Sequence, residues 1–440
     1  MNATYELAFS KRDTVANVDS AELHFQNAMQ LVHEKIVASL DVATADGFSD
    51  QQLVEALKPF VDEIISEENI EVEESEKQRL LRELPQEMFG AGPLEVLLQD
   101  PKVSDILVNH CHEIFVEREG RLELSKAIFA NNTHLVRIIQ RLVTHVGRSI
   151  DESNPLVDAR MEDGSRINAI IPPLALDGPK LSIRRFGNHN FDLAKLVESG
   201  ALTIEMAQFL KAAVISRQSV LISGGTGSGK TTFLNALSSC IPNDQRIVTI
   251  EDSAELKLQH SHVARLETRP AGNEDVTEFN QRDLVKNALR MRPDRIIVGE
   301  VRGSEALDML QAMNTGHEGS LTTVHANSAL DAVSRLEMMV AMGGLELPIS
   351  VVRAYICSGI SIIVHLSRLQ GGVRKVMRVA ELVGSENGYE LNELFAFRAQ
   401  GLDANGRMTG SFATINQSIC ESKFEEYGLS LTEPNAQLSI

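Results

Sequence analysis

Residues 220–231 read VLISGGTGSGKT, a short apolar run followed by the complete pattern G-x-x-x-x-G-K-T. The run 220–223 predicts a buried strand and Thr231–Ser239 predicts a helix, so the pattern has the strand–loop–helix context that it requires. Glycines let successive backbone N–H groups converge on phosphate oxygens, and the start of the helix adds the positive end of its dipole. The stretch therefore predicts a phosphate-binding loop in an α/β domain.

This loop predicts a nucleotide site that uses Mg²⁺. Lys230 can reach the β- and γ-phosphates, and the Thr231 hydroxyl can bind the metal ion. A glycine-rich turn that matches by chance is the alternative, which the flanking strand and helix disfavour. The residues expected to bind the nucleotide are Gly224, Gly225, Thr226, Gly227, Ser228, Gly229, Lys230, Thr231 and Thr232.

Strands and helices alternate through residues 191–440, which predicts a parallel sheet with helical crossovers. The expected strands are 219–223, 246–250, 295–298, 321–324 and 361–365. The expected helices are 231–239, 278–291, 304–314 and 329–342.

Polar side chains follow three of these strands. The second strand runs into a segment that ends at Glu255, and the third runs into Glu300. Carboxylates at the carboxyl ends of neighbouring parallel strands can hold Mg²⁺ and orient a water molecule, although a lone glutamate there is usually just solvated. His325 ends another strand and could bond a γ-phosphate or these carboxylates, although a lone histidine is usually structural or exposed.

The sequence before residue 191 predicts three further segments. Residues 1–20 lack periodicity and are expected to be a disordered leader. Residues 21–90 predict a small acidic helical bundle with helices at 23–40, 53–65 and 73–84, and with Ser49 as a possible N-cap. Residues 91–190 predict a mixed α/β domain with strands at 104–108 and 113–117, a hairpin turn at 119–121 and a helix at 134–145.

Charge and apolar patterning exclude several classes of protein. The net charge is −19, and residues 1–90 alone hold 19 acidic and 7 basic side chains, which disfavours duplex nucleic acid as a partner. That acidic surface is either simply solvated or a specific docking face. The longest charge-free apolar stretch, 354–364, is shorter than the ~20 residues of a membrane span, so we expect a soluble protein that would act on a membrane only from outside the bilayer.

The four cysteines of the chain are widely spaced, with no C-x-x-C pattern. This spacing disfavours both a disulfide framework and a zinc ribbon. His110-Cys111-His112 supplies at most two ligands on one strand face, which is weak evidence for a metal.

Four sequence blocks together resemble the type II/type IV secretion and pilus-assembly ATPase family, most closely its CpaF-type tight-adherence (Flp) branch. The resemblance covers roughly residues 90–400. An upstream stretch, 157–168 and 181–186, is similar to the CpaF-type N-terminal domain. The four blocks are the Walker A run 224–231, an Asp box at 249–255, a Walker B motif at 297–303 and a His box at 321–326.

The resemblance implies a homohexameric ring whose RecA-like motor domain follows the N-terminal domain. It implies that ATP and Mg²⁺ bind at Lys230 and Thr231, that Glu255 polarises the attacking water, that Glu300 holds Mg²⁺ through water and that His325 senses the γ-phosphate. The division of labour between the two glutamates stays open. The arginines that would neutralise transition-state charge come from the set Arg160, Arg166, Arg184 and Arg185.

The family resemblance also implies partners and a location. The ring would dock beneath inner-membrane platform proteins of the pilus, on the cytoplasmic side, and ATP hydrolysis would drive pilin extraction or secretion. Ser253 stands where many pilus motors have proline, and the tetracysteine zinc element of some members is absent. The alternatives are a nucleotide-gated scaffold with little hydrolysis, a GTPase switch, which the lack of an Asn-Lys-x-Asp motif disfavours, and a DNA translocase, which the acidic charge disfavours.

Overall fold

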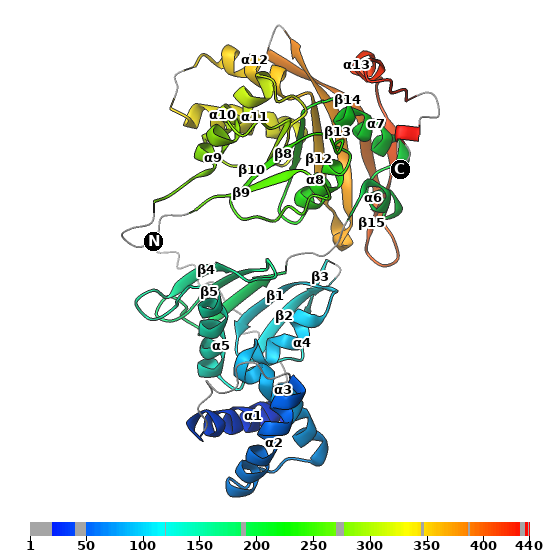
Figure 1. The fold of residues 1–440 in the computed structure, drawn as a ribbon. Coiled ribbons are helices and arrows are strands. Elements are labelled where there is room, and N and C mark those ends of the chain that lie inside the picture. The colour runs from blue at the N-terminus through cyan, green and yellow to red at the C-terminus, as the bar shows by residue number, and fades with distance from the viewer. Residues whose placement is uncertain are drawn as a thin grey trace, which may run out of the picture. The chain divides into compact units, whose positions relative to one another are not determined.

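The structure is a computed structural model of the chain, and it forms two compact units, 1–187 and 188–440 (Figure 1). It describes residues 20–39, 50–118, 120–185, 191–269, 277–344, 347–385, 388–431, 436–438 and 440. The predicted leader up to residue 19 and the possible N-cap Ser49 lie outside these residues. Within the described residues, no helix is both long and apolar enough to cross a bilayer.

Three helices at the start of the first unit pack around one apolar core, as the sequence predicts. They are α1 (Ser20–Ser39), α2 (Asp50–Glu67) and α3 (Glu74–Phe89). Each helix presents one apolar stripe, because its apolar residues recur at helical spacing, and the stripes meet at a buried cluster. The most buried members of the cluster are Phe25, Met29, Val32, Ile36, Val61, Leu80 and Leu84.

A six-stranded antiparallel sheet follows, in the order β3-β2-β1-β6-β5-β4. Helix α5 (Asn132–His145) covers one face of it, because buried apolar residues of β1, β2, β4, β5 and β6 alternate with more polar ones and pack in one cluster with that helix. The strands are β1 (Val103–His110), β2 (Glu113–Arg118), β3 (Arg121–Leu124), β4 (Leu156–Arg160), β5 (Arg166–Ile170) and β6 (Lys180–Arg184), and the short η2 (Gly92–Leu94) and α4 (Glu95–Gln99) precede them.

A buried polar cluster joins the helical bundle to helix α5. The Glu87 carboxylate, 2% exposed, accepts hydrogen bonds from His134 Nε2 at 3.1 Å and from Arg137 Nη2 at 2.7 Å. Burial opposes the charge of Glu87, but His134 and Arg137 outweigh it and hold the pKa of this carboxyl below its usual value. The bundle is therefore attached to the sheet domain through a charge that needs both of its partners.

The second unit is built on a nine-stranded sheet in the order β15-β14-β13-β12-β7-β11-β10-β8-β9. The six strands from β12 to β9 are parallel, as predicted, and β12 to β15 form an antiparallel extension that the sequence analysis did not anticipate beyond 361–365. The strands are β7 (Val220–Gly224), β8 (Ile247–Glu251), β9 (Val263–Glu267), β10 (Arg295–Val301), β11 (Leu321–His325), β12 (Ile362–Arg368), β13 (Arg374–Ser385), β14 (Gly388–Leu402) and β15 (Met408–Thr414).

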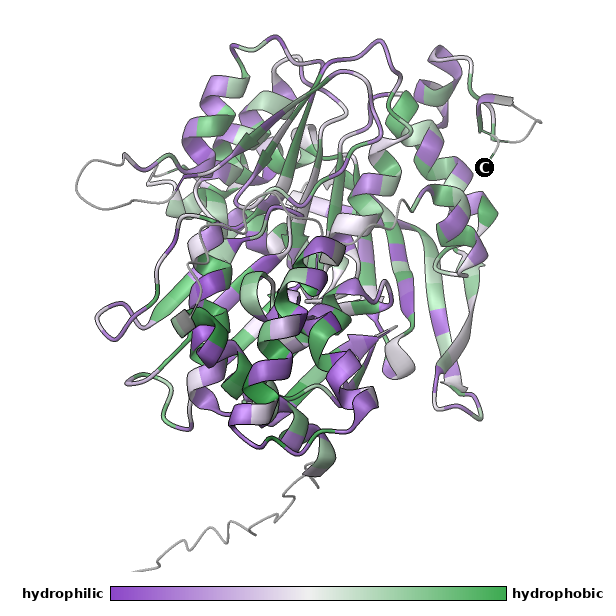
Figure 2. Ribbon diagram, turned by 60° about the horizontal axis from the view of Figure 1, so that its bottom comes forward, coloured by the Kyte–Doolittle hydropathy of each residue, from purple (hydrophilic) through white to green (hydrophobic). Residues whose placement is uncertain are grey.

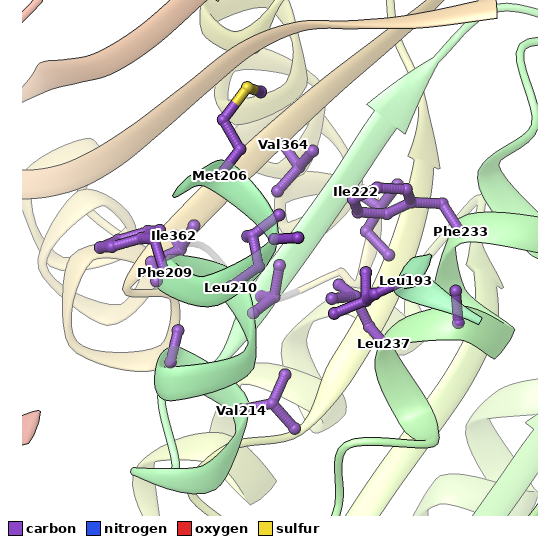
Figure 3. Packing of buried hydrophobic residues seen from close by; sticks show 14 of the residues in the cluster. Leu193, Met206, Phe209, Leu210, Val214, Ile222, Phe233, Leu237, Ile362 and Val364 are labelled. Carbon is purple, nitrogen blue, oxygen red and sulfur yellow. The ribbon is translucent and has the colours of Figure 1, made fainter. Parts of the chain in front are cut away.

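Helices cover both faces of this sheet, so most residues of its central strands are buried, and the apolar parts of these strands appear green in Figure 2. On β7, Val220 and Ile222 pack in the cluster of one face, in which Figure 3 shows Ile222, and Leu221 packs in the cluster of the other face. One face carries α6 (Leu193–Glu198), α7 (Ile204–Ile215) and α8 (Lys230–Ser238), and the other carries α9 (Gln281–Ala288), α10 (Glu305–Asn314), α11 (Ala329–Met342) and α12 (Ile349–Gly359). The short helix α13 (Glu421–Glu426) follows the last strand.

These elements confirm the α/β fold class, with a P-loop sheet domain preceded in sequence by a mixed α/β domain and a helical bundle. The predicted helix at 278–291 is shorter in the structure, because Asn280 caps α9 in a reciprocal capping box with Asp283. Helices α7 and α12 were not predicted.

Candidate functional site

The predicted site residues of the second unit lie at one edge of its sheet, where four parallel strands end. Gly224, at the end of β7, is the register partner of His325 at the end of β11. The neighbouring strand β10 ends just beyond Glu300, and β8 ends at Glu251. The carboxyl ends of parallel strands form the edge at which α/β sheets bind ligands, so the arrangement suits a bound nucleotide.

The glycine-rich loop has a backbone that larger residues could not adopt. Gly227 and Gly229 have φ values of 68° and 94°, in the left-handed region that favours glycine. A Cβ atom on Gly224 would lie 2.5 Å from both the Leu366 carbonyl oxygen and Ser228 Oγ. Helix α8 begins directly after the loop, so its unpaired N–H groups are available to phosphate oxygens.

Lys230 is the first residue of α8, and its amine folds back over the loop. Its Nζ donates to the carbonyl oxygens of Gly224 at 3.0 Å and Gly225 at 3.1 Å. Burial lowers the pKa of the amine from its usual value, while Glu300 and Glu255 act in the opposite direction. Lys230 and Glu300 thus lie on α8 and β10, which both meet the edge of the sheet where the loop lies.

Glu300 lies in an irregular part of β10, where the register with β11 shifts between Val298 and Val301. Its Oε2 accepts two hydrogen bonds from Arg302, from Nε at 3.1 Å and from Nη2 at 2.7 Å. The third guanidinium nitrogen, Nη1, lies 3.8 Å from Asp252 Oδ2. Arg302 therefore connects the acidic ends of β10 and β8.

Glu255 is held in place by a residue that the sequence analysis did not single out. Glu251 Oε2 accepts the backbone N–H groups of Glu255 at 2.7 Å and Leu256 at 2.8 Å. Glu251 is 3% exposed, and burial raises the pKa of its carboxyl. Its position as the last residue of a buried strand, directly before the acidic turn, is the signal that could have identified it.

The predicted arginines of the first unit fall into two groups. Arg160, Arg166 and Arg184 are register partners on β4, β5 and β6, so they lie side by side on the polar face of the sheet. Arg184 Nε also donates to Asp105 Oδ1 at 3.1 Å. Arg185 is separate, because its Nη1 donates to the Val103 carbonyl oxygen at 3.2 Å and to that of Asp100.

The residues of the loop edge fit a nucleotide with Mg²⁺. Helix α8 offers its N-terminus for phosphate, Thr231 is its second residue, and two carboxylates act on the neighbouring lysine. Oxygen ligands from one hydroxyl and one carboxylate, with water and phosphate oxygens completing the shell, are typical of Mg²⁺. The described residues contain no group of three or more His, Cys, Asp or Glu side chains that could hold a metal ion by themselves, and His110 Nδ1 instead accepts the His112 backbone N–H at 3.1 Å.

The sequence of the chain was compared with models of protein families, and one of them matches most of it. The model of the family described as "Type II/IV secretion system protein" matches residues 87–409. The chain belongs to the type II/IV secretion system protein family.

Several relatives in this family are similar over most of the chain. A putative conjugal transfer protein of Mycobacterium tuberculosis (strain ATCC 25618 / H37Rv) is 38% identical over 312 residues, which cover 70% of this chain and 88% of that protein. The conjugal transfer protein TrbB of Rhizobium radiobacter is 34% identical over 323 residues, 72% of this chain and 95% of that protein. A solved structure, the VirB11 ATPase of the Brucella suis type IV secretion system in complex with sulphate, is 30% identical, covers 65% of this chain and 94% of that one, and has a TM-score of 0.36.

Two further basic residues of this type II/IV secretion family member contact the loop. Arg374 Nε donates to the Gly227 carbonyl oxygen at 3.0 Å, and Arg368 Nη1 lies 3.3 Å from the position that a Cβ atom on Gly227 would occupy. Both come from the hairpin of β12 and β13. On β12, His365 Nδ1 also lies 3.0 Å from Ser223 Oγ of β7. Sequence reasoning missed these residues, because only the pairing of β7 with β12 brings the hairpin to the loop.

Proposed function

We propose that this chain hydrolyses ATP at the glycine-rich loop and, as a homohexameric ring, uses the energy to power assembly or secretion of a tight-adherence (Flp) pilus. The observation that carries the proposal is that the glycine-rich loop with Lys230, the end of β8 that leads to Glu255, and Glu300 near the end of β10 all lie at one edge of the parallel sheet. Phosphoryl transfer to water needs a bound phosphate, a positioned metal ion and an oriented water molecule. This edge of the sheet has candidate residues for each of these three tasks.

Each residue of the edge has a proposed part in the reaction. Lys230 leaves the loop carbonyls to bind the β- and γ-phosphates, and Glu255, held through its backbone by Glu251, orients the attacking water. His325, beside Gly224 in the sheet, hydrogen-bonds the γ-phosphate.

A bound Mg²⁺ supplies positive charge that stabilises the transferring phosphoryl group. Thr231 would bind it directly, and Glu300 would hold it through water. Both Arg302 hydrogen bonds go to Oε2 of Glu300 and orient the carboxylate, and Oε1 would be the oxygen that holds the ion through water.

Arg160, Arg166 and Arg184 are the proposed charge-neutralising arginines. They are register partners on the adjacent strands β4, β5 and β6, so all three could act on the same phosphate group. We assign Arg185 a structural part, because its guanidinium holds backbone carbonyl groups at the start of β1.

The pilus assignment and the partners rest on the sequence blocks at 224–231, 249–255, 297–303 and 321–326 together with family membership. The proposed partners are inner-membrane platform proteins of the pilus, with the ring on the cytoplasmic side of that membrane and without nucleic acid. The alternative is a nucleotide-gated scaffold, which would bind ATP without appreciable turnover.

The test compares Lys230→Ala with Lys58→Ala, a matched change at an exposed lysine of α2. We expect Lys230→Ala to abolish phosphate release from ATP while the thermal unfolding midpoint stays near that of the unchanged chain, and Lys58→Ala to retain full turnover. Unchanged turnover in Lys230→Ala overturns the hydrolase proposal. ATP binding without turnover in the unchanged chain, even with purified platform protein present, supports the scaffold instead, and electron microscopy with a non-hydrolysable ATP analogue reports whether the ring forms.

A further inference from the structure

The segment that carries Glu255 is held by side chains from three different elements. It leaves β8 after Glu251, and its residues 254–260 have no regular secondary structure. We call residues 254–257 the glutamate turn. Each of its four backbone N–H groups donates to a side-chain oxygen, which satisfies donors that no helix or strand pairs here. The side chains that accept these four N–H groups are Glu267 of β9, Glu251 of β8 and Asn235 of α8.

Glu251 holds the middle of the glutamate turn, and the other two side chains hold its ends. Glu267 Oε1 accepts the Ala254 N–H at 3.2 Å. Glu267 is the last residue of β9 and the register partner of Glu251, so these two carboxylates come from neighbouring strand ends. Asn235 Oδ1 accepts the Lys257 N–H at 3.2 Å. The turn is therefore fixed at both ends as well as in its middle.

Asn235 links the glutamate turn to the helix that would bind the phosphates. It lies on α8, whose N-terminus is the end that would face phosphate oxygens. Leu256 of the turn is 1% exposed and packs in the same apolar cluster as Phe233 and Leu237 of α8. The turn and α8 thus share a hydrogen bond and an apolar core. Glu255 is consequently placed with reference to the phosphate-binding helix itself.

A carboxylate that orients the attacking water has to stay at a fixed place relative to the phosphates. The water attacks in line with the leaving group, so its direction of approach is narrow. A misplacement of about 1 Å can slow an enzyme reaction about 100-fold. A segment without regular secondary structure keeps such precision only when other groups hold its backbone.

We propose that Asn235 and Glu267 are positioning residues for ATP hydrolysis, which hold the glutamate turn so that Glu255 keeps its place relative to phosphates bound at α8. This inference rests on the proposed function and deepens it, because it adds two residues that serve the same reaction without touching the nucleotide. Loss of either acceptor oxygen slows hydrolysis and leaves nucleotide binding intact.

The test measures kcat and KM for phosphate release from ATP, and binding of fluorescent mant-ADP with Mg²⁺, in the full chain. Asn235→Leu and Glu267→Met remove the acceptor oxygens at similar side-chain size, whereas Asn235→Asp and Glu267→Gln keep them. One matched control is Asn314→Leu, at a half-buried asparagine of α10 that donates to the Tyr355 carbonyl oxygen. The other is Glu390→Met, at an exposed glutamate of β14.

We expect Asn235→Leu and Glu267→Met each to lower kcat by about tenfold, the effect of one lost hydrogen bond. KM and mant-ADP binding should stay near those of the unchanged chain, because the lost contact serves the transition state and not the bound nucleotide. Asn235→Asp and Glu267→Gln should retain most of the turnover. Both control variants should hydrolyse ATP as the unchanged chain does.

The outcomes separate the positioning residues from the proposed function. Turnover in Asn235→Leu and Glu267→Met equal to that of the controls overturns the positioning proposal and leaves the ATPase proposal standing, and a loss at one residue alone overturns the part of the other. Loss of mant-ADP binding in step with turnover also overturns it, because the two residues then only support the fold of the site. Equal losses in the variants with and without the acceptor oxygen overturn it as well.

No turnover in the unchanged chain, or full turnover in Lys230→Ala, overturns both proposals. Thermal unfolding without nucleotide identifies any variant that fails to fold. Glu267→Met, at an exposed residue of an edge strand, then carries the test against Glu267→Gln.

Discussion

Arg302 donates two hydrogen bonds to a single carboxylate oxygen of Glu300, which lies two residues before it in the chain. The same guanidinium approaches Asp252 to 3.8 Å. Hydrogen bonding to Glu300 raises the pKa of Arg302, so this cation is firmly kept at the acidic edge of the sheet. One arginine thus sets the orientation of the carboxylate proposed to act on the metal ion.

Glu300→Gln tests that carboxylate. The amide keeps the size of the side chain but removes its charge, so we expect ATP turnover to fall by about 100-fold while mant-ADP still binds. The control is Glu318→Gln, at an exposed glutamate before the start of β11, which should retain full turnover. Phosphate-release kinetics of the two variants provide the comparison, and equal rates in them would remove Glu300 from the reaction.

Gly224 and Gly225 offer a matched pair in the loop. A Cβ atom on Gly224 would clash at 2.5 Å with the Leu366 carbonyl oxygen, whereas a Cβ on Gly225 meets nothing within 4 Å. We expect Gly224→Ala to lower the free energy of unfolding by about 1–3 kcal/mol, as overpacking does, and Gly225→Ala to change it far less. Urea denaturation without nucleotide measures both. Similar values for the two variants would contradict the close approach of β12 to the loop.

Much of the fold could be predicted from the sequence, because its apolar residues repeat with a clear period. Helix α11 has the predicted bounds, Ala329–Met342, and the five predicted strands are all present. Helix α7 escaped prediction because its residues are buried on most sides, so it lacks the polar stripe that marks an amphipathic helix. Strands β13 and β14 escaped it because charged residues interrupt their alternation, and β15 escaped it because it has few apolar residues.

The residues at the edge of the sheet that carries the glycine-rich loop could also be predicted. The G-x-x-x-x-G-K-T pattern identifies the loop residues directly, and neighbouring parallel strands end at the same edge of a sheet. The register of Gly224 with His325 agrees with that expectation. Glu251 was missed because its function lies in the backbone of Glu255, which a pattern of side chains does not report. Arg368 and Arg374 were missed because their proximity to Gly227 comes from pairing between strands far apart in the chain.

Glu251→Gln tests how much the burial of this carboxylate lowers the free energy of unfolding. Burial raises its pKa in the folded protein, so the folded state binds more protons than the unfolded state between the ordinary glutamate pKa, about 4.3, and the raised value. The stability of the unchanged chain therefore falls as pH rises through that range. An amide oxygen can accept the same two N–H groups without the charge, so Glu251→Gln should be the more stable protein at pH 8. Denaturation curves at pH 8 and pH 4.5 provide the comparison, and an advantage for the variant that grows toward low pH would contradict the raised pKa.

Glu87→Ala tests the joint between the helical bundle and α5. The change leaves the buried His134 and the guanidinium of Arg137 without their carboxylate, so we expect a loss of about 3–5 kcal/mol in the free energy of unfolding. Glu83→Ala is the control, because Glu83 pairs with Arg79 in a partly exposed bridge, and it should cost less than about 1 kcal/mol. Equal losses in the two variants would show that the buried cluster adds no more than a surface pair.

The pairing of β7 with β12 has a consequence for biosynthesis. Ser223 and His365 are neighbours in the sheet but lie 142 positions apart, so this contact forms only after a long loop has closed. Until residues 362–368 have been synthesised, one edge of β7 has no neighbouring strand, and it can pair with strands of other protein chains. The nascent chain thus passes through a stage in which the glycine-rich turn exists without its second flanking strand, and aggregation during translation is the hazard that this topology carries.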